Sequence, residues 1–382
     1  MPWNETSVDE LRRDFVVMAQ QEGCHVRHLC QCFGISAKTG YKWLERYAHG
    51  GVAALTNHSC RPLSSPQRTA PDIERLVLKL RHEHPAWGGR KLARRLNDLG
   101  LSSIPVASTV TEILRRHGQL GLPEGEGRQT RYHRFEHDAP NQLWQIDFKS
   151  PVHTARGVCH PLTVLDDHSR YNLVLHACSR QRTQDIQPIF TDTFRRYGLP
   201  IRINADNGPP WGSSREPSHG LSTFSVWLVR LGIRISHSRP YHPQTNGKDE
   251  RFHRSLGREV LNAVGFADKE QLQRALSRWR LCYNHERPHE ALQLSVPAAR
   301  YRPSARAYPE HLPAIEYGPD DDVVRVSWNG EMRAFGQKWK VPKALNGLNI
   351  AIRPAHGQED GLYHLYFCHH CFGQLDLRIA RQ

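Results

Sequence analysis

Long apolar runs are absent from this sequence. No stretch of about eighteen consecutive apolar residues occurs, so no segment has the length and hydrophobicity of a transmembrane helix. The first residues, MPWNETSVDELRRDF, lack the basic start and apolar core of a secretory signal peptide. We therefore expect a cytoplasmic protein with neither a membrane span nor a signal peptide.

The sequence also lacks a regular cysteine framework. Its nine cysteines are odd in number and irregularly spaced, which favours reduced thiols over disulfides. Two segments, CHVRHLCQC at 24–32 and CHHC at 368–371, contain zinc-type ligands. Neither has the second, well-spaced pair that completes a closed four-ligand site, so the spacing does not favour the zinc alternative at either segment.

Acidic residues are outnumbered by basic ones. The 52 Lys and Arg residues against 38 Asp and Glu give a net charge of +14. This excess favours a polyanionic partner such as nucleic acid, with an acidic membrane surface as the competing partner.

The chain of 382 residues with 38% hydrophobic residues is long enough for two to four domains.

The first predicted domain, residues 1–56, has helix-turn-helix spacing. Apolar positions at Leu11, Phe15, Val16 and Met18 indicate a first helix. VRHLCQCFGISAKTGYKWLERY then predicts a short helix, a turn at Gly34 and a second helix capped by Ser36, with Tyr41 and Leu44 facing inward. A plain three-helix unit is the alternative to DNA binding. The residues that we expect to contact DNA are Lys38, Thr39, Lys42 and Arg46.

A second all-α module is predicted over residues 71–119, between linkers at 57–70 and 120–140. Three amphipathic segments, DIERLVLKLRHEHP, GGRKLARRLNDLG and ASTVTEILRRHG, resemble another helix-turn-helix or winged-helix-like domain, with Ser108 as the cap of the third helix. Arg90 and Lys91 are its candidate DNA contacts. Two such modules in tandem suit recognition of one long DNA site.

Residues 141–304 change to an α/β pattern with a mixed sheet. Short apolar runs such as LWQIDF and PLTVLDDHSRYNLVLHAC predict strands, TQDIQPIFTDTFRRYG predicts a helix, and PIRINADNG predicts a further strand. Asp147 interrupts the first strand and Asp206 ends a later one, at the sheet edge where α/β folds bind ligands. A turn-forming Asp206 and a satisfied buried Asp147 are the structural alternatives.

The segment RPYHPQTNGKDERFHRSLGREV, residues 239–260, runs from a loop into a helix and places the acid Glu250 among bases. An ordinary surface ion pair with Arg254 is one interpretation. The other is that Glu250 joins Asp147 and Asp206 in binding metal, while the bases bind DNA phosphates. The DNA-contacting residues predicted here are His242, Gln244, Asn246, Lys248, Arg251, Arg254 and Arg258.

Five short motifs, WQIDF, DDHSRY, ADNG, YHPQTNGKDERFHRSL and YNHERPHEAL, occur in order. Together they resemble the catalytic core of DDE transposases with a retroviral-integrase-type, ribonuclease-H-like fold, in particular the bacterial insertion sequence 481 family. The resemblance implies that Asp147 and Asp206 are the catalytic aspartates and Glu250 the catalytic glutamate, on a helix facing the sheet. A loop insertion at 209–220 lengthens the usual spacing, and a shifted helix register would put Asp249 in place of Glu250.

Three carboxylates are hard oxygen ligands that suit two Mg²⁺ (or Mn²⁺) ions acting on a phosphodiester. Asp166 and Asp167 are candidates for supporting or substitute ligands, and Asp167 or Ser169 otherwise caps a turn. Residues 305–382 predict a small all-β domain with a hairpin at Asn329-Gly330.

The sequence thus predicts a nucleoid-associated transposase. It is expected to bind double-stranded DNA at terminal inverted repeats and at the target, to nick and transfer strands, and to act as a homo-oligomer without a membrane or small-molecule partner. The alternatives are a catalytically inactive or domesticated DNA-binding regulator, which an intact acidic triad disfavours, and a simple ribonuclease-H-like nuclease, which has no need of two DNA readers.

Overall fold

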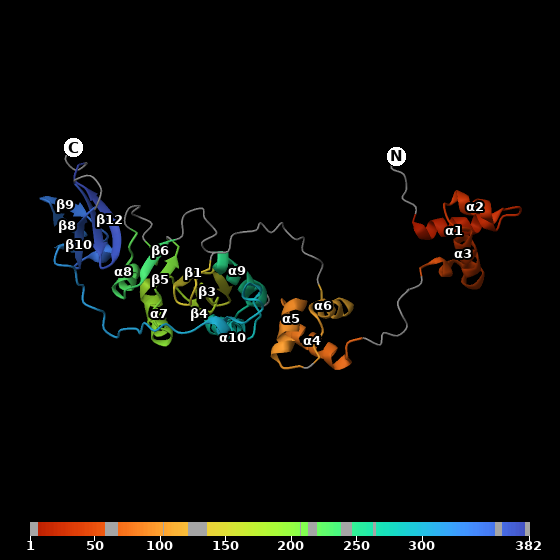
Figure 1. Ribbon diagram of the computed structural model, residues 1–382, viewed down its shortest axis with the longest axis horizontal. Helices are drawn as coiled ribbons and strands as arrows, with labels where there is room; N and C mark the ends of the chain where they lie inside the picture. The colour runs from red at the N-terminus through yellow and green to blue at the C-terminus, as the bar shows by residue number, and fades with distance from the viewer. Residues whose placement is uncertain are drawn as a thin grey trace. The chain divides into compact units, whose positions relative to one another are not determined.

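The structure is a computed structural model, and Figure 1 shows its elements from α1 in red to β12 in blue. It divides into two compact units, Met1–Arg68 and Thr69–Gln382. The predicted fold class is confirmed: helical modules precede a mixed-sheet core, and an all-β region follows it. The described residues are 7–57, 68–101, 103–120, 136–206, 208–212, 220–237, 247–262, 265–355 and 361–378.

The first unit is a small helical module with its own core. Ser7 caps its first helix through a reciprocal capping box with Glu10, and the side chain of Ser36 accepts a hydrogen bond from the backbone N–H of Thr39 at the third. Phe15 and Trp43 are buried between the helices, whereas Leu11 and Met18 are each 44% exposed. The elements of this unit are α1 (Val8–Ala19), α2 (Val26–Cys32), α3 (Ala37–Gly50) and the 3₁₀ turn η1 (Gly51–Leu55).

The expectation that Tyr41 faces inward is wrong. Tyr41 is 51% exposed, and Trp43 fills the core in its place. Gly40 fixes this rotation of α3, because a β-carbon there would lie 2.3 Å from the Cys30 sulfur. The buried face therefore runs through positions 40, 43, 44 and 47, and Tyr41 lies about 100° away from Gly40 around the helix.

A second helical module opens the larger unit. Its core residues include Val77, Leu80, Trp87, Leu92 and Ile113. The predicted cap at Ser108 is wrong, because the third helix begins at Ala107 with Val106 in the cap position and no side-chain cap bond. The helices are α4 (Pro71–Glu83), α5 (Gly89–Asp98) and α6 (Ala107–Arg116).

The start of α5 lies so close to α6 that only glycine fits. A β-carbon on Gly89 would lie 2.2 Å from the Thr111 hydroxyl and 2.6 Å from the Ala107 carbonyl, whereas Gly88 has nothing within 4 Å. We expect Gly89→Ser to lower the free energy of unfolding by about 1–3 kcal/mol through overpacking. Gly88→Ser, the matched control, should be neutral or slightly stabilising because Ser is a favoured N-cap residue. Calorimetric unfolding of both variants tests the pair, and equal effects would contradict it.

A mixed six-stranded sheet forms the core of the larger unit. Its strand order is β2-β3-β1-β5-β6, with β4 also paired to β3. β1 pairs antiparallel with β3 and parallel with β5, and β5 pairs parallel with β6. The strands are β1 (Leu143–Phe148), β2 (Val152–Thr154), β3 (Gly157–Asp166), β4 (Asn172–Cys178), β5 (Arg202–Ala205) and β6 (Arg234–His237).

Helices cover both faces of this sheet because side chains alternate along the strands. Trp144 and Ile146 pack with the aromatic side chains of α7 and α8 in one cluster. Leu165 and Leu175 pack with α9 and α10 in another, which includes Phe252 and Trp279. The helices of this part are α7 (Thr183–Tyr197), α8 (Thr223–Arg230), α9 (Gly247–Leu256), α10 (Lys269–His285) and α11 (Pro297–Arg300), with a π turn η3 (Gly257–Leu261) and a 3₁₀ turn η4 (Glu290–Leu292).

The C-terminal part is all-β, but its hairpin differs from the prediction. The four-stranded antiparallel sheet has the order β12-β11-β10-β7, and a separate hairpin joins β8 to β9. The reversal occurs at Phe335-Gly336, where both residues have positive φ, rather than by pairing of the runs on either side of Asn329-Gly330. The elements are β7 (Asp322–Arg325), β8 (Glu331–Ala334), β9 (Gln337–Lys340), the 3₁₀ turn η5 (Lys343–Leu345), β10 (Asn349–Pro354), β11 (Leu362–Phe367) and β12 (His370–Asp376).

The described part of the chain contains neither a membrane-spanning helix nor a disulfide. None of its helices combines the length and apolarity needed to cross a bilayer. Its cysteines are all free thiols, and neither of the two cysteine-containing segments assembles three close metal-type ligands.

Candidate functional site

Asp147 and Asp206 lie side by side at one edge of the central sheet. The parallel pairing of β1 with β5 sets Gln145 opposite Asn204, so the residues two positions further along each chain, Asp147 and Asp206, follow in register. Asp206 directly follows the last residue of β5, and its Oδ1 accepts a hydrogen bond from the Gly208 backbone N–H at 3.1 Å. The strand register therefore brings both aspartates to the same edge, and the Gly208 backbone N–H helps to orient the Asp206 side chain.

Asp147 points to the sheet face that α9 covers. It alternates with Ile146, which belongs to the opposite cluster, and the Phe148 backbone N–H donates to its Oδ1 at 2.7 Å. His253 of α9 places its Nδ1 3.8 Å from Asp147 Oδ2 and bonds through Nε2 to the Thr163 hydroxyl at 3.0 Å. Burial lowers the pKa of His253 to about 4, so the imidazole is neutral at physiological pH.

Glu250 opens onto a hollow beside this edge. It lies in the first turn of α9, is exposed, and forms no ion pair with Arg254, although both residues are described. The hollow has a volume of about 930 Å³, and basic residues line it together with Glu250. The basic residues are Lys149, Arg254 and Arg258, and two histidines, His153 and the neutral His253, also line the hollow.

The three acids interact electrostatically. Burial raises the pKa of Asp147 to about 6, and the nearby charges of Asp206 and Glu250 add to the rise. Burial also raises the pKa of Asp206. Their oxygens are not all within 4.8 Å of one another. Two metal ions about 3.5–4 Å apart do not require such a close cluster, because each carboxylate can contact a different ion.

Asp249, the alternative to Glu250, faces inward. It is 1% exposed, and neither of its oxygens has a hydrogen-bond partner among the described residues. Burial raises its pKa well above the usual range, and repulsion from Asp147 and Asp167 adds to the rise. Burial of a carboxylate without hydrogen-bond partners favours the neutral acid, and Asp249 lies behind the site rather than in the hollow.

The buried Asp249 gives the protein a predicted pH dependence of stability. Its pKa is higher in the folded than in the unfolded state, so its stabilising contribution is complete below the unfolded pKa of about 3.9 and is lost as the pH rises through the folded pKa. We expect Asp249→Asn to be more stable than the wild type at pH 8, with a smaller difference at pH 5. Urea unfolding in EDTA at both pH values tests this, and a difference that grows as the pH falls would contradict it.

Asp166 and Asp167 are bound by internal donors. Asp166 accepts hydrogen bonds from the backbone N–H and the hydroxyl of Ser169 and from the Asn141 backbone N–H. The Ser169 hydroxyl accepts from the Tyr171 backbone N–H at 3.2 Å, so Asp166 and Ser169, rather than Asp167, cap this turn. Asp167, with its side chain 1% exposed, accepts from Gln145 and pairs with the ammonium group of Lys248. Both acids therefore support the fold around the site.

Lys248 was predicted to contact DNA, but its side chain points inward. It is 17% exposed, and its ammonium group pairs with Asp167. Lys248 points inward because it lies at the start of α9, two residues before Glu250. At this position its side chain meets Asp167, which follows the end of β3. Lys248 therefore stabilises the helix that carries Glu250.

The other predicted DNA contacts fall into three groups. On α3, Lys38 and Lys42 are exposed, Thr39 bonds to the Ser36 hydroxyl, and Arg46 lies over the Trp43 ring at 5.0 Å. Arg90 of α5 and Arg251 of α9 both approach Glu290, at 3.8 and 3.7 Å, and burial lowers the pKa of Lys91 to about 8. Arg254 and Arg258 line the hollow, while His242, Gln244 and Asn246 lie outside the described residues.

The sequence interpretation missed the lysine and the two histidines that line the hollow, Lys149, His153 and His253. A signal was present for two of them. Lys149 follows Asp147 by two residues, and His253 follows Glu250 by three, which places it one helical turn away. His153 lies on β2, and only the pairing of β2 with β3 brings it near.

Comparison with known proteins agrees with this architecture. Two family models described as "Integrase core domain" match residues 137–243 and 231–297. A helix-turn-helix model matches residues 11–62 and a homeodomain-like model matches residues 39–114. The model described as "IS481 family transposase, C-terminal domain" matches residues 321–382.

Individual relatives include insertion-element proteins. The Burkholderia multivorans "Insertion element IS407 uncharacterized 31.7 kDa protein" is 25% identical over 251 residues, covering 62% of this chain and 86% of that protein. The corresponding IS476 protein of Xanthomonas euvesicatoria is 24% identical over 262 residues, covering 66% of this chain and 71% of that protein. A Gag-Pol polyprotein of baboon endogenous virus is 32% identical over 209 residues, covering 51% of this chain and 11% of the polyprotein.

Two solved structures are similar at low TM-scores. A chain of the simian T-cell lymphotropic virus intasome, in complex with PP2A regulatory subunit B56 gamma, has 17% identity and a TM-score of 0.39, covering 79% of this chain and 96% of that chain. The HTLV-2 integrase catalytic core domain, in complex with magnesium, has 16% identity and a TM-score of 0.33, covering 43% of this chain and 99% of that chain. The family matches and the insertion-element relatives agree with one another: the chain contains an integrase core domain, preceded by helix-turn-helix matches and followed by a match to the C-terminal domain of IS481 family transposases.

Proposed function

We propose that this chain is a DNA transposase that binds the terminal inverted repeats of its insertion sequence and catalyses Mg²⁺-dependent strand nicking and strand transfer. The observation that carries the proposal is the strand register that puts Asp147 beside Asp206, with Glu250 on the helix that contacts β1. Acids from two strands and a helix converge here beside a basic hollow. This combination suits chemistry on a phosphodiester.

The donor set fits a hard divalent cation. All three candidate ligands, Asp147, Asp206 and Glu250, offer carboxylate oxygens, which Mg²⁺ and Mn²⁺ prefer. Burial is the main cause of the raised pKa of Asp147, and the charges of Asp206 and Glu250 add to it, so a bound cation would favour the ionised carboxylate. When bound, such a cation supplies Lewis-acid stabilisation of phosphate oxygens and favours deprotonation of a bound hydroxyl.

The remaining residues orient the substrate and the ligands. Lys149, Arg254 and Arg258 present cationic groups around Glu250, where the phosphates of the DNA end would pair with them. His253, bonded to Thr163 through Nε2, packs beside Asp147 with its Nδ1 3.8 Å from Oδ2. With water as nucleophile the 3′-oxygen leaves and the strand is nicked; with a DNA 3′-hydroxyl as nucleophile the strand is transferred.

DNA recognition is assigned to the two helical modules. Lys38 and Lys42 on α3 are the exposed cations best suited to a DNA groove, and the second module adds length to the recognised site. Two transposon ends must be brought together, so a homo-oligomer assembled on DNA is expected. A regulator without catalysis is the second candidate, and the retained acids argue against it.

The test is a cleavage assay with purified protein and end-labelled terminal-repeat DNA. We expect nicked and strand-transfer products when Mg²⁺ or Mn²⁺ is present. We expect no products when EDTA is added or when both metals are left out of the buffer. Specific binding without any product at any Mg²⁺ or Mn²⁺ concentration would support the regulator instead. Products formed equally well from DNA without the repeats would contradict the proposed recognition of the ends.

A related prediction concerns Arg254, which is exposed and lines the hollow. If it contacts one phosphate, Arg254→Ala should reduce the slope of log affinity against log salt concentration by about 0.9. Arg195→Ala is the control, because the Arg195 guanidinium is engaged by Glu310 at 2.6 Å. Fluorescence anisotropy at several salt concentrations measures both slopes, and an unchanged slope for Arg254→Ala would remove this residue from the interface.

A further inference from the structure

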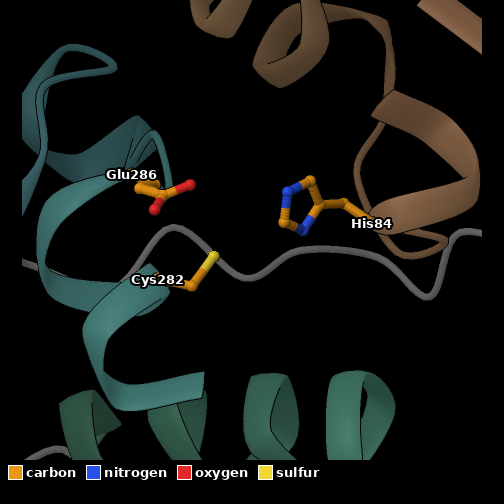
Figure 2. Close-up of side chains that lie close together, drawn as sticks. All are labelled: His84, Cys282 and Glu286. Atoms are coloured by element: carbon orange, nitrogen blue, oxygen red, sulfur yellow. The ribbon is translucent and has the colours of Figure 1, made fainter. Parts of the chain in front are cut away.

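Three side chains of different chemistry converge where the second helical module meets the end of α10. They are His84, which follows α4, and Cys282 and Glu286 at the end of α10; Figure 2 shows them directed toward one another. One nitrogen of the imidazole, the thiol sulfur and one carboxylate oxygen all lie within 4.8 Å of one another. This is the one such group of three or more metal-type ligands in the part of the chain that the structure describes.

The fold holds these groups in place from both sides. Cys282 and Glu286 are four residues apart, and the Glu286 backbone N–H donates to the Cys282 carbonyl at 2.8 Å, so their side chains lie on one face of α10. The His84 ring stacks on the fully buried indole of Trp87, with ring centroids 3.8 Å apart and planes 7° from parallel. Arg81 in turn donates to the Trp87 carbonyl at 2.8 Å. The imidazole therefore has a rigid support that fixes its direction.

The three groups are available as ligands. Among the described residues, neither the His84 ring nor the Cys282 sulfur makes a hydrogen bond, and Glu286 uses only Oε2, with Arg95 at 2.8 Å. Arg95 is positioned to orient the carboxylate, as hydrogen-bond partners of metal ligands commonly do.

We propose that His84, Cys282 and Glu286 bind one Zn²⁺ ion that fastens the second helical module to the end of α10. A sulfur, nitrogen and oxygen donor set selects zinc and disfavours Mg²⁺, which prefers oxygen alone. The Cys282 S–H bond breaks as the S–Zn bond forms, and the proton passes to solvent. Zinc bond lengths of about 2.0–2.3 Å bring ligand atoms about 3.3–3.8 Å apart, which small side-chain rotations achieve. Water fills the fourth position.

The consequence is structural. The second helical module packs on the core through Cys282, which lies against its apolar cluster, and through the pair formed by Arg95 and Glu286. A metal bond between His84 and α10 would strengthen this junction. The position of a DNA-reading module relative to the carboxylates would then depend on zinc, a metal distinct from the one proposed for catalysis.

Cobalt substitution tests the site separately from the catalytic carboxylates. Adding Co²⁺ to the metal-stripped, full-length protein should produce the near-ultraviolet charge-transfer absorption of a cobalt–thiolate bond, saturating at one equivalent. The acids of the sheet edge cannot produce this band because they contain no sulfur. Zn²⁺ should displace Co²⁺ and abolish the band, and Mg²⁺ should not.

Matched cysteine variants identify the ligand. Cys282→Ser should abolish the band, whereas Cys32→Ser and Cys371→Ser, which change exposed cysteines elsewhere, should retain it. His84→Gln, on the other side of the junction, should weaken Zn²⁺ binding by at least about tenfold. This variant tests the proposed site if Cys282→Ser does not fold. No band in the wild type, a band that survives Cys282→Ser, or unchanged affinity in His84→Gln would overturn the proposal.

Discussion

Glu250→Gln is expected to lower metal-dependent cleavage of terminal-repeat DNA by about a thousandfold or more, a loss of the size seen when one strong transition-state contact is removed. The amide keeps the shape of the side chain and removes its negative charge, which is what a hard divalent cation requires. Because Glu250 is exposed and makes no ion pair with the described residues, the fold should tolerate the change. Unfolding curves and DNA affinity should therefore stay close to those of the wild type.

Asp249→Asn is the matched control, one residue away and identical in kind. Asp249 is 1% exposed and has no hydrogen-bond partner for either oxygen among the described residues, so it presents no charge to the hollow. We expect this variant to cleave at a rate within a few-fold of the wild type. Single-turnover cleavage of labelled DNA at a fixed Mg²⁺ concentration compares the two variants. An inactive Asp249→Asn beside an active Glu250→Gln would reverse the assignment and move the helix register by one residue.

The strands of the α/β core and the positions of its acids could be predicted, because each depends on residues that are close together in the sequence. Asp147 interrupts an apolar strand, Asp206 ends one, and Asn and Gly follow it, so their positions at strand ends were readable from the order of residues. The step that the sequence could not supply is the pairing of β1 with β5. That register, which sets Gln145 opposite Asn204, makes the two acids neighbours.

The predictions that were wrong depend on packing between segments that are distant in the sequence. Tyr41 and Trp43 both suit a helix, and the close approach of Gly40 to Cys30 decides which of them is buried. In the C-terminal part, β7 pairs with β10 rather than with the adjacent β8, so a nearby Asn-Gly turn predicts the wrong hairpin. Periodicity and turn composition do not contain these contacts.

The inward position of Lys248 leads to the second large expected effect. Lys248→Met removes the cation paired with Asp167, whose side chain is 1% exposed, and leaves that carboxylate charge buried. Gln145 and the His137 backbone N–H, at 2.9 and 3.0 Å, still donate to it, but they carry no full charge. Breaking a buried pair from one side typically costs about 3–5 kcal/mol, and we expect a loss near the lower end. Urea unfolding at constant ionic strength measures it.

Two further variants separate this structural role from DNA binding. Lys149→Met makes the same change at a lysine that lines the hollow; it should alter stability by only about 0.5 kcal/mol while weakening DNA binding and its salt dependence. The double variant Lys248→Met with Asp167→Asn removes both charges and should regain part of the lost stability, because an amide is less costly to bury than a carboxylate. If Lys248→Met instead leaves stability unchanged and weakens DNA binding as Lys149→Met does, then Lys248 faces DNA and the inward pair with Asp167 does not form in solution.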